Sequence, residues 1–300
     1  MNIHQLKVFI EMCGGSTLAE TAEKMGLKQP TASFHLRKLE EELGVELFRK
    51  QSRSLYPGEA AAELLPFARR IVHLTEAAQE AMSSYKSRQG GRLRLGASYT
   101  PATYVLPSYI ADFQSKHPGV SLQLTVKQAE GVLAMLREYI VDAGIVSLGA
   151  TESEGLVVVP LLPDELQLLM SPEHPLAASG EPTIERLAKE TFLLHETGST
   201  SRTLSDEWAE SNGLSWSHVL ELGAIETIKE AIKCNMGIGI LPGRSVRREV
   251  EAGELAMKKL PGYVNRRYIC LAYRDEDQLS GAVRSFLSYI GQALAQHGKL

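Results

Sequence analysis

The chain has few of the residues that mark metal clusters, disulfide frameworks or membrane spans. Its three cysteines, Cys13, Cys234 and Cys270, lie far apart with no CxxC or Cys/His spacing, which argues against a metal site and a disulfide framework. Buried thiols are the simplest interpretation, and a redox switch is the alternative. No apolar run approaches the roughly 20 residues that cross a bilayer. The first residues lack the cationic and apolar regions of a secretory signal, which predicts a cytoplasmic protein without a membrane partner.

An excess of positive charge is also missing. The 32 Lys and Arg residues against 36 Asp and Glu residues leave a net charge of -4, so any surface for nucleic acid must be local. Residues 28–53 form such a region, because they contain six basic and four acidic side chains and therefore have a net charge of +2. A length of 300 residues predicts two or three domains.

The first sixty residues carry the signals of a helix-turn-helix. Thr17 and Glu20 have the spacing of a capping box, so a helix is expected to begin at about Leu18. Gly26 suits the left-handed conformation that ends a helix. Pro30 suits the first position of the next helix, where its missing N–H costs nothing. Two helices joined by so short a turn predict a helix-turn-helix.

The second of these helices separates an apolar stripe from a polar face at about 100° per residue. We expect the stripe to face the core, and it consists of Ala32, Leu36, Leu39 and Leu43. The opposite face carries Thr31, Phe34, His35 and Lys38. An outward Phe34 is unfavourable on an ordinary surface, but in a major groove it can contact a thymine methyl.

A basic turn follows the second helix. Residues 43–56 hold two short apolar segments around a basic tip, a pattern that predicts a β-wing over the phosphate backbone. A basic turn alone is usually a solvated surface. The order of capped helix, glycine turn, proline-started helix and basic wing nevertheless predicts double-stranded DNA as a partner. The residues expected to contact DNA are Lys28, Gln29, Pro30, Thr31, Ser33, Phe34, His35, Arg37, Lys38, Arg49, Lys50 and Arg53.

Residues 27–33 and 39–49 closely resemble the signature of the LysR-type transcriptional regulators. The sequence departs from it at Lys28, where the family usually has Ser, and at Phe34, where it often has Arg. The resemblance therefore does not predict the usual helix cap at Lys28 or the common DNA contact at Phe34. The resemblance implies an α/β protein with a winged helix-turn-helix (residues 1–58), a linker and dimerisation helix with a hinge (59–89) and a two-lobed, periplasmic-binding-protein-like effector domain (90–300). Lobe one is expected at about 92–161 and 268–300, and lobe two at about 162–267.

The linker has the apolar spacing of a coiled-coil seam. Gly58 offers an N-cap for a helix that runs to about Lys86. The seam either packs on the chain's own globular domain or pairs with a second copy. A two-fold DNA reader favours pairing, and we expect a homodimer that associates as a dimer of dimers. The seam consists of Phe67, Ile71, Leu74, Ala78, Ala81 and Tyr85.

After about residue 92 the pattern alternates strands with helices, which implies parallel strands under covering helices. Ligands in such folds lie beyond the carboxyl ends of strands, at helix N-termini. Hydroxyl-rich turns at 97–101 and 196–202 occupy these places; the second resembles the family's Glu-Pro-Gly-Ser-Gly-Thr-Arg segment. Helix capping alone also selects Ser and Thr, so these turns either only cap helices or contact a ligand. If they contact a ligand, the N–H donors at the helix ends favour a small anionic effector. The expected effector residues are Ser98, Thr100, Ser147, Ser199, Thr200, Ser201 and Glu226.

Two other functions fit the sequence less well. No nucleophile with a base, carboxylate pair or metal set has convincing spacing, so neither an enzyme nor a cofactor is expected. His195 and Glu196 beside Ser199 come nearest, but they lack a nucleophile elbow. A free-standing solute receptor accounts for residues 92–300 and leaves the first ninety unexplained. The sequence therefore predicts a sequence-specific DNA-binding regulator modulated by a small anionic effector bound between two lobes.

Overall fold

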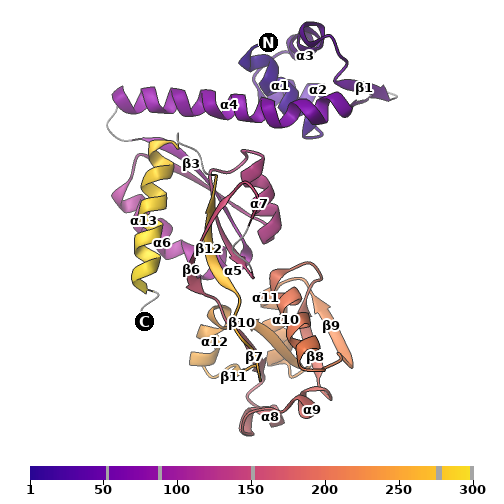
Figure 1. Cartoon of the computed structure of the whole chain (residues 1–300), viewed down its shortest axis with the longest axis vertical. Coiled ribbons are helices and arrows are strands. Elements are labelled where there is room, and N and C mark those ends of the chain that lie inside the picture. Colours follow the sequence, from indigo (N-terminus) through magenta and orange to yellow (C-terminus); the bar gives the residue numbers. More distant parts are fainter. Residues whose placement is uncertain (52–53, 87–89, 150–152, 275–278, 298–300) are drawn as a thin grey trace. The chain divides into compact units, whose positions relative to one another are not determined.

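The computed structural model describes residues 1–51, 54–86, 90–149, 153–274 and 279–297 (Figure 1). They belong to two compact units. The first comprises residues 1–88 with 138–140 and 278–281, and the second comprises the rest. Among the described residues, no helix combines the length and hydropathy that a membrane span needs.

The first unit is a winged helix-turn-helix with a long helix. Its helices are α1 (Ile3–Cys13), α2 (Leu18–Lys24), α3 (Gln29–Leu43) and α4 (Glu59–Lys86). The antiparallel strands β1 (Phe48–Gln51) and β2 (Ser54–Pro57) form the wing. The Thr17 hydroxyl accepts from the backbone N–H of Glu20, whose carboxylate accepts from the N–H of Thr17 at 2.7 Å. Gly26 has φ +64°, so both predicted ends of α2 are confirmed.

Helix α3 differs from expectation at its C-terminal end. Ala32, Leu36 and Leu39 are buried as predicted, but Leu43 is 38% exposed. Its assignment to the core stripe is wrong because the chain turns at Gly44, whose φ is +71°, and Leu47 is the residue that is buried. At the other end, Lys28 is the N-cap and makes no side-chain capping bond, so the usual cap is missing.

Helix α4 packs one face on its own domain. Ala61 and Ala68 are fully buried against the core of α1 to α3. Lys7 of α1 also pairs with Glu76 at 2.8 Å. Ile71, which the spacing assigns to the seam, is half-buried against the same core. An apolar stripe on another face remains exposed, and its described members are Phe67, Leu74, Ala78 and Met82.

The second unit holds two five-stranded sheets. The sheet that we call lobe one has the order β4-β3-β5-β12-β6, in which β3, β4 and β5 are parallel and β12 is antiparallel to β5 and β6. Phe113 and Phe286 meet edge to face at 5.3 Å, so α6 and α13 lie on the same side of this sheet (Figure 1). The elements are β3 (Gly91–Ala97), α5 (Tyr99–Tyr104), α6 (Leu106–Lys116), β4 (Val120–Val126), α7 (Ala129–Arg137), β5 (Ala143–Leu148), β6 (Val157–Pro163), β12 (Tyr268–Tyr273) and α13 (Gly281–His297).

Lobe two has the strand order β11-β7-β10-β8-β9. Side chains alternate across β7, so that Leu168 packs with Trp208 of α10 while Leu169 packs with Ile228 of α11. The two helices therefore cover opposite faces. The elements are β7 (Leu166–Met170), α8 (Pro175–Ala178), α9 (Ile184–Leu187), β8 (Thr191–His195), α10 (Thr200–Ser211), β9 (His218–Leu222), α11 (Ile225–Lys233), β10 (Ile238–Pro242), η1 (Gly243–Ser245), α12 (Arg247–Glu251) and β11 (Ala256–Lys259).

The chain crosses between the lobes twice, after β6 and again between β11 and β12. The two crossings are bonded to each other, because the backbone N–H of Asp164 donates to the carbonyl of Arg267 at 2.9 Å. The Asp164 carboxylate also pairs with the Arg267 guanidinium, and both side chains are buried. A helix-turn-helix followed by a two-sheet α/β domain confirms the predicted fold class.

We expect Gly237→Ala to destabilise lobe two. A Cβ atom at Gly237 would lie 2.3 Å from the Thr191 carbonyl oxygen, and backbone on both sides leaves little room for relaxation. The free energy of unfolding should fall by about 1–3 kcal/mol, as for overpacked cores. Urea unfolding measures it. Gly180→Ala is the control, because nothing lies within 4 Å of that position; equal stability of the two variants would contradict the packing.

Candidate functional site

The outward face of α3 presents most of the predicted DNA contacts. Every predicted residue from Lys28 to Lys38 is exposed except His35, which is half-buried and lies between the rings of His4 and Phe34. Phe34 is 53% exposed. Arg49 and Lys50 are exposed on β1, whereas Arg53 lies outside the described residues.

Two cations of this surface have a partner within α3. Arg37 and Lys38 lie 3.6 Å and 3.5 Å from the Glu41 carboxylate. Exposed ion pairs of this kind contribute about 0–1 kcal/mol, so they exchange readily for phosphate. The surface therefore keeps its positive charge available to a polyanion.

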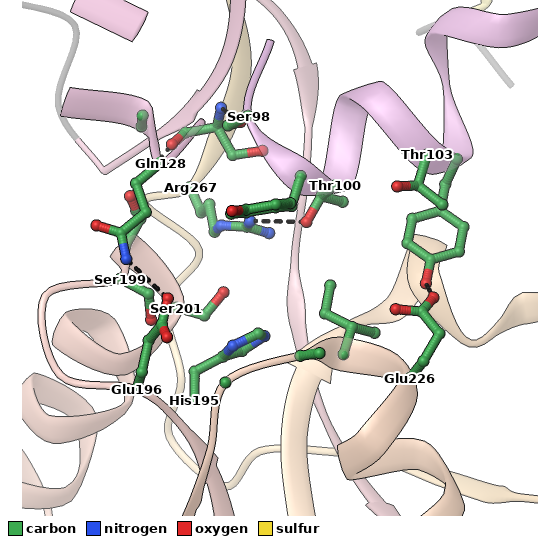
Figure 2. A pocket seen from close by; sticks show the side chains of 18 residues that line it. Ser98, Thr100, Thr103, Gln128, His195, Glu196, Ser199, Ser201, Glu226 and Arg267 are labelled. Carbon is green, nitrogen blue, oxygen red and sulfur yellow. Dashed lines mark hydrogen bonds between the residues drawn. The ribbon is translucent and has the colours of Figure 1, made fainter. Parts of the chain in front are cut away.

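A cavity of about 250 Å³ lies between the two lobes of the second unit (Figure 2). All seven effector residues predicted from the sequence line it. The structure thus brings together two turns that are about a hundred residues apart in the chain. The lining also includes polar residues that the sequence did not single out for effector contact, namely Thr103, Tyr104, Gln128, His195, Glu196 and Arg267.

The hydroxyl groups of the cavity are joined in a network. The Ser98 hydroxyl accepts from the backbone N–H of Ser147 at 2.9 Å instead of capping α5. The Ser147 hydroxyl donates to Asp164 at 3.0 Å, and the Thr200 hydroxyl donates to the Ser147 carbonyl at 3.3 Å. Ser199, in contrast, caps α10 by accepting from the N–H of Arg202. Helix capping therefore accounts for Ser199 and not for Ser98.

Arg267 supplies a buried cation at the cavity wall. It is 3% exposed, pairs with Asp164 and donates to the Thr100 hydroxyl at 3.3 Å. Its Nε has no hydrogen-bond partner among the described residues. Burial lowers the pKa of Arg267, but a guanidinium stays protonated in proteins. A planar cation lining a cavity suits a carboxylate or phosphate. No local pattern around Arg267 marks it, since only the tertiary fold brings the second crossing to the cavity.

Two carboxylates of the cavity bond to the opposite lobe. Glu196 accepts from the Gln128 amide at 2.7 Å, and Glu226 accepts from the Tyr104 hydroxyl. His195 carries no charge at neutral pH, because burial and the nearby Arg267 cation lower the pKa of its imidazole to about 4. Among the described residues, no group of three or more His, Cys, Asp or Glu side chains is placed to hold a metal ion.

Comparison with known proteins identifies both halves of the chain. Residues 3–62 match the bacterial regulatory helix-turn-helix proteins of the lysR family, and residues 86–295 match the LysR substrate binding domain. The HTH-type transcriptional regulator YeiE of Escherichia coli K12 is 30% identical over 293 residues, which cover 98% of each chain. The RuBisCO operon transcriptional regulator of Allochromatium vinosum is 28% identical over 301 residues, which cover 100% of this chain and 99% of the relative.

The fold also resembles that of a solved structure. A full-length OxyR variant from Pseudomonas aeruginosa superposes with a TM-score of 0.75 at 23% identity, covering 100% of this chain and 95% of OxyR. The sequence relatives are transcriptional regulators and not enzymes. The chain belongs to the LysR family of DNA-binding transcriptional regulators, with a helix-turn-helix and a domain that binds small-molecule effectors.

Proposed function

We propose that this regulator binds a specific DNA sequence and responds to a small anionic effector held in the cavity between the lobes. Arg267 carries the proposal, because a buried guanidinium beside the Thr100 hydroxyl offers charge and directed donors to an anion. The cavity of about 250 Å³ is smaller than the roughly 300–1,000 Å³ of pockets for drug-sized ligands. A small carboxylate or an inorganic oxyanion fits this size.

The wall of the cavity that lobe two contributes adds further hydrogen-bond donors. Thr200 and Ser201 begin α10, a helix of 12 residues whose first N–H groups and positive dipole end favour negative charge. The carboxylates of Glu196 and Glu226 are already bonded to partners on the other lobe. An anion in this part of the cavity can accept from the Arg267 guanidinium and from the first N–H groups of α10.

We further propose that the protein works in the cytoplasm as a homodimer that pairs into a dimer of dimers. The exposed apolar stripe on α4 supports pairing, since Phe67, Leu74 and Met82 are 64%, 41% and 62% exposed. Burying a large apolar side chain is worth about 1.5–3 kcal/mol. Two copies that meet through this stripe give the two-fold arrangement that suits a palindromic operator.

Lys38→Ala and Arg49→Ala should each weaken DNA binding and flatten its salt dependence. Each phosphate contact that is lost removes about 0.9 from the slope of log affinity against log salt concentration. Fluorescence anisotropy over a salt series measures the slope. Lys116→Ala on α6 is the matched control and should leave the slope unchanged. Unchanged slopes for both test variants would exclude this surface as the phosphate contact.

Phe67→Asp together with Leu74→Asp should dissociate the oligomer. The double variant would bury two unpaired carboxylates wherever α4 pairs with a second copy. Analytical ultracentrifugation should show a smaller species with weaker operator binding. Ala62→Asp is the control, because Ala62 is exposed on α4 outside the stripe. A double variant with the parent's mass and operator affinity would place the dimer contact elsewhere.

Thr100→Val and Thr200→Val should each weaken effector binding while operator affinity is kept. A hydrogen bond to a charged group is worth about 1.5–3 kcal/mol, or roughly tenfold to a hundredfold in affinity. Calorimetry of the full chain with a panel of small carboxylates and inorganic oxyanions measures it, with the melting temperature recorded alongside. Thr203→Val on α10 is the control, since its hydroxyl bonds the Ser199 carbonyl. Absence of binding by the whole panel, or binding unaffected by both variants, would contradict the proposal.

A further inference from the structure

Tyr104 is a residue of lobe one that contacts the interior of lobe two. It is the last residue of α5, and its ring packs against the buried lobe-two cluster that includes Leu169, Leu193 and Ile225. Its hydroxyl donates to the Glu226 carboxylate in the first turn of α11. Tyr104 therefore combines an apolar and a polar contact across the boundary between the lobes.

A buried cation supports this contact from the lobe-two side. The Lys229 ammonium lies 5.3 Å from the centre of the Tyr104 ring and 3.5 Å from its hydroxyl. Lys229 is 6% exposed, and Glu249 at 2.7 Å and the Ser245 carbonyl at 3.3 Å fix its position. A cation is attracted to an aromatic face, and the attraction is strongest when the cation is desolvated. Lobe two thus presents a binding site for the ring whose side chains are held in place by contacts of their own.

The hydroxyl remains a donor under all ordinary conditions. Burial and the adjacent Glu226 carboxylate raise the pKa of Tyr104. A second pair, Gln128 with Glu196, crosses between the lobes as well. Figure 2 shows Glu226 on one side of the cavity and the Gln128–Glu196 pair on the other, with Arg267 and Thr100 between them. The effector region is bordered by contacts that need no effector.

We infer that Tyr104 is a positioning residue that clamps lobe two onto lobe one through Glu226 and Lys229, and that this clamp holds the cavity closed before the effector arrives. The sequence pattern assigned Glu226 to the effector, whereas its bond to Tyr104 gives it a role in the clamp. A closed arrangement that is already populated strengthens binding, because apparent affinity scales with the competent fraction. The clamp does not depend on the charge of the effector.

The test measures the distance between the lobes in the full-length protein without effector. Spin labels are attached at Gln114 on α6 and Glu210 on α10, both exposed, after Cys13 and Cys234 are replaced by alanine. Dilution with unlabelled protein isolates the distance within one chain. The parent should give one narrow distribution. Tyr104→Phe and Glu226→Ala should broaden it and shift it to longer distances.

Two further variants separate the hydrogen bond from other causes. Glu226→Gln keeps an oxygen that accepts from Tyr104 and should restore the narrow distribution. Tyr99→Phe changes a neighbouring tyrosine of the same cavity and should leave the distribution unchanged. The clamp is overturned if Tyr104→Phe matches the parent, or if Glu226→Gln is as broad as Glu226→Ala. Should Tyr104→Phe fail to fold, Glu226→Ala carries the test, because that side chain is 63% exposed.

Discussion

The ion pair between Asp164 and Arg267 joins the two segments that connect the lobes, and the geometry of the cavity depends on it. Both side chains are buried, and one lone oxygen of Asp164 and the Nε of Arg267 have no partner among the described residues. Desolvation makes such a pair a weak source of stability. Its value lies in position, because the carboxylate orients the guanidinium toward Thr100 while also accepting from Ser147. One interaction thus links the two crossings between the lobes, the hydroxyls of Thr100 and Ser147, and the cation proposed to bind the effector.

Local signals allowed much of the first unit to be predicted. Thr17, Gly26 and Pro30 act through bonds and backbone angles within a few residues, so their consequences can be read without the rest of the fold. Leu43 and Ile71 illustrate the limit. Helical spacing places both on an apolar face, but the turn at Gly44 leaves Leu43 exposed, and the core of α1 to α3 takes up Ile71.

The cavity shows the same division between local and long-range information. Its hydroxyl residues follow strands and begin helices, so the rule for ligand sites at strand ends was enough to gather them. Gln128 also obeys this rule, since it lies between the end of β4 and the start of α7. Arg267 and Tyr104 do not, and each reaches the cavity because a crossing or a helix end of one lobe is brought against the other. Glu226 was assigned to the cavity from sequence, but its partner Tyr104 is 122 positions away and no spacing within either segment links them.

The packing of α4 on α1 affects how such a regulator can evolve to bind operators with a different spacing. Ala61 and Ala68 pack α4 against the same core that holds the buried face of α3. In the proposed dimer, the separation of the two α3 helices is then decided by where along α4 the copies meet. A helix advances about 1.5 Å per residue and DNA about 3.4 Å per base pair. Substitutions in the exposed stripe can therefore re-space operator half-sites while the bases read by α3 stay the same, so spacing and sequence preference can evolve on separate surfaces.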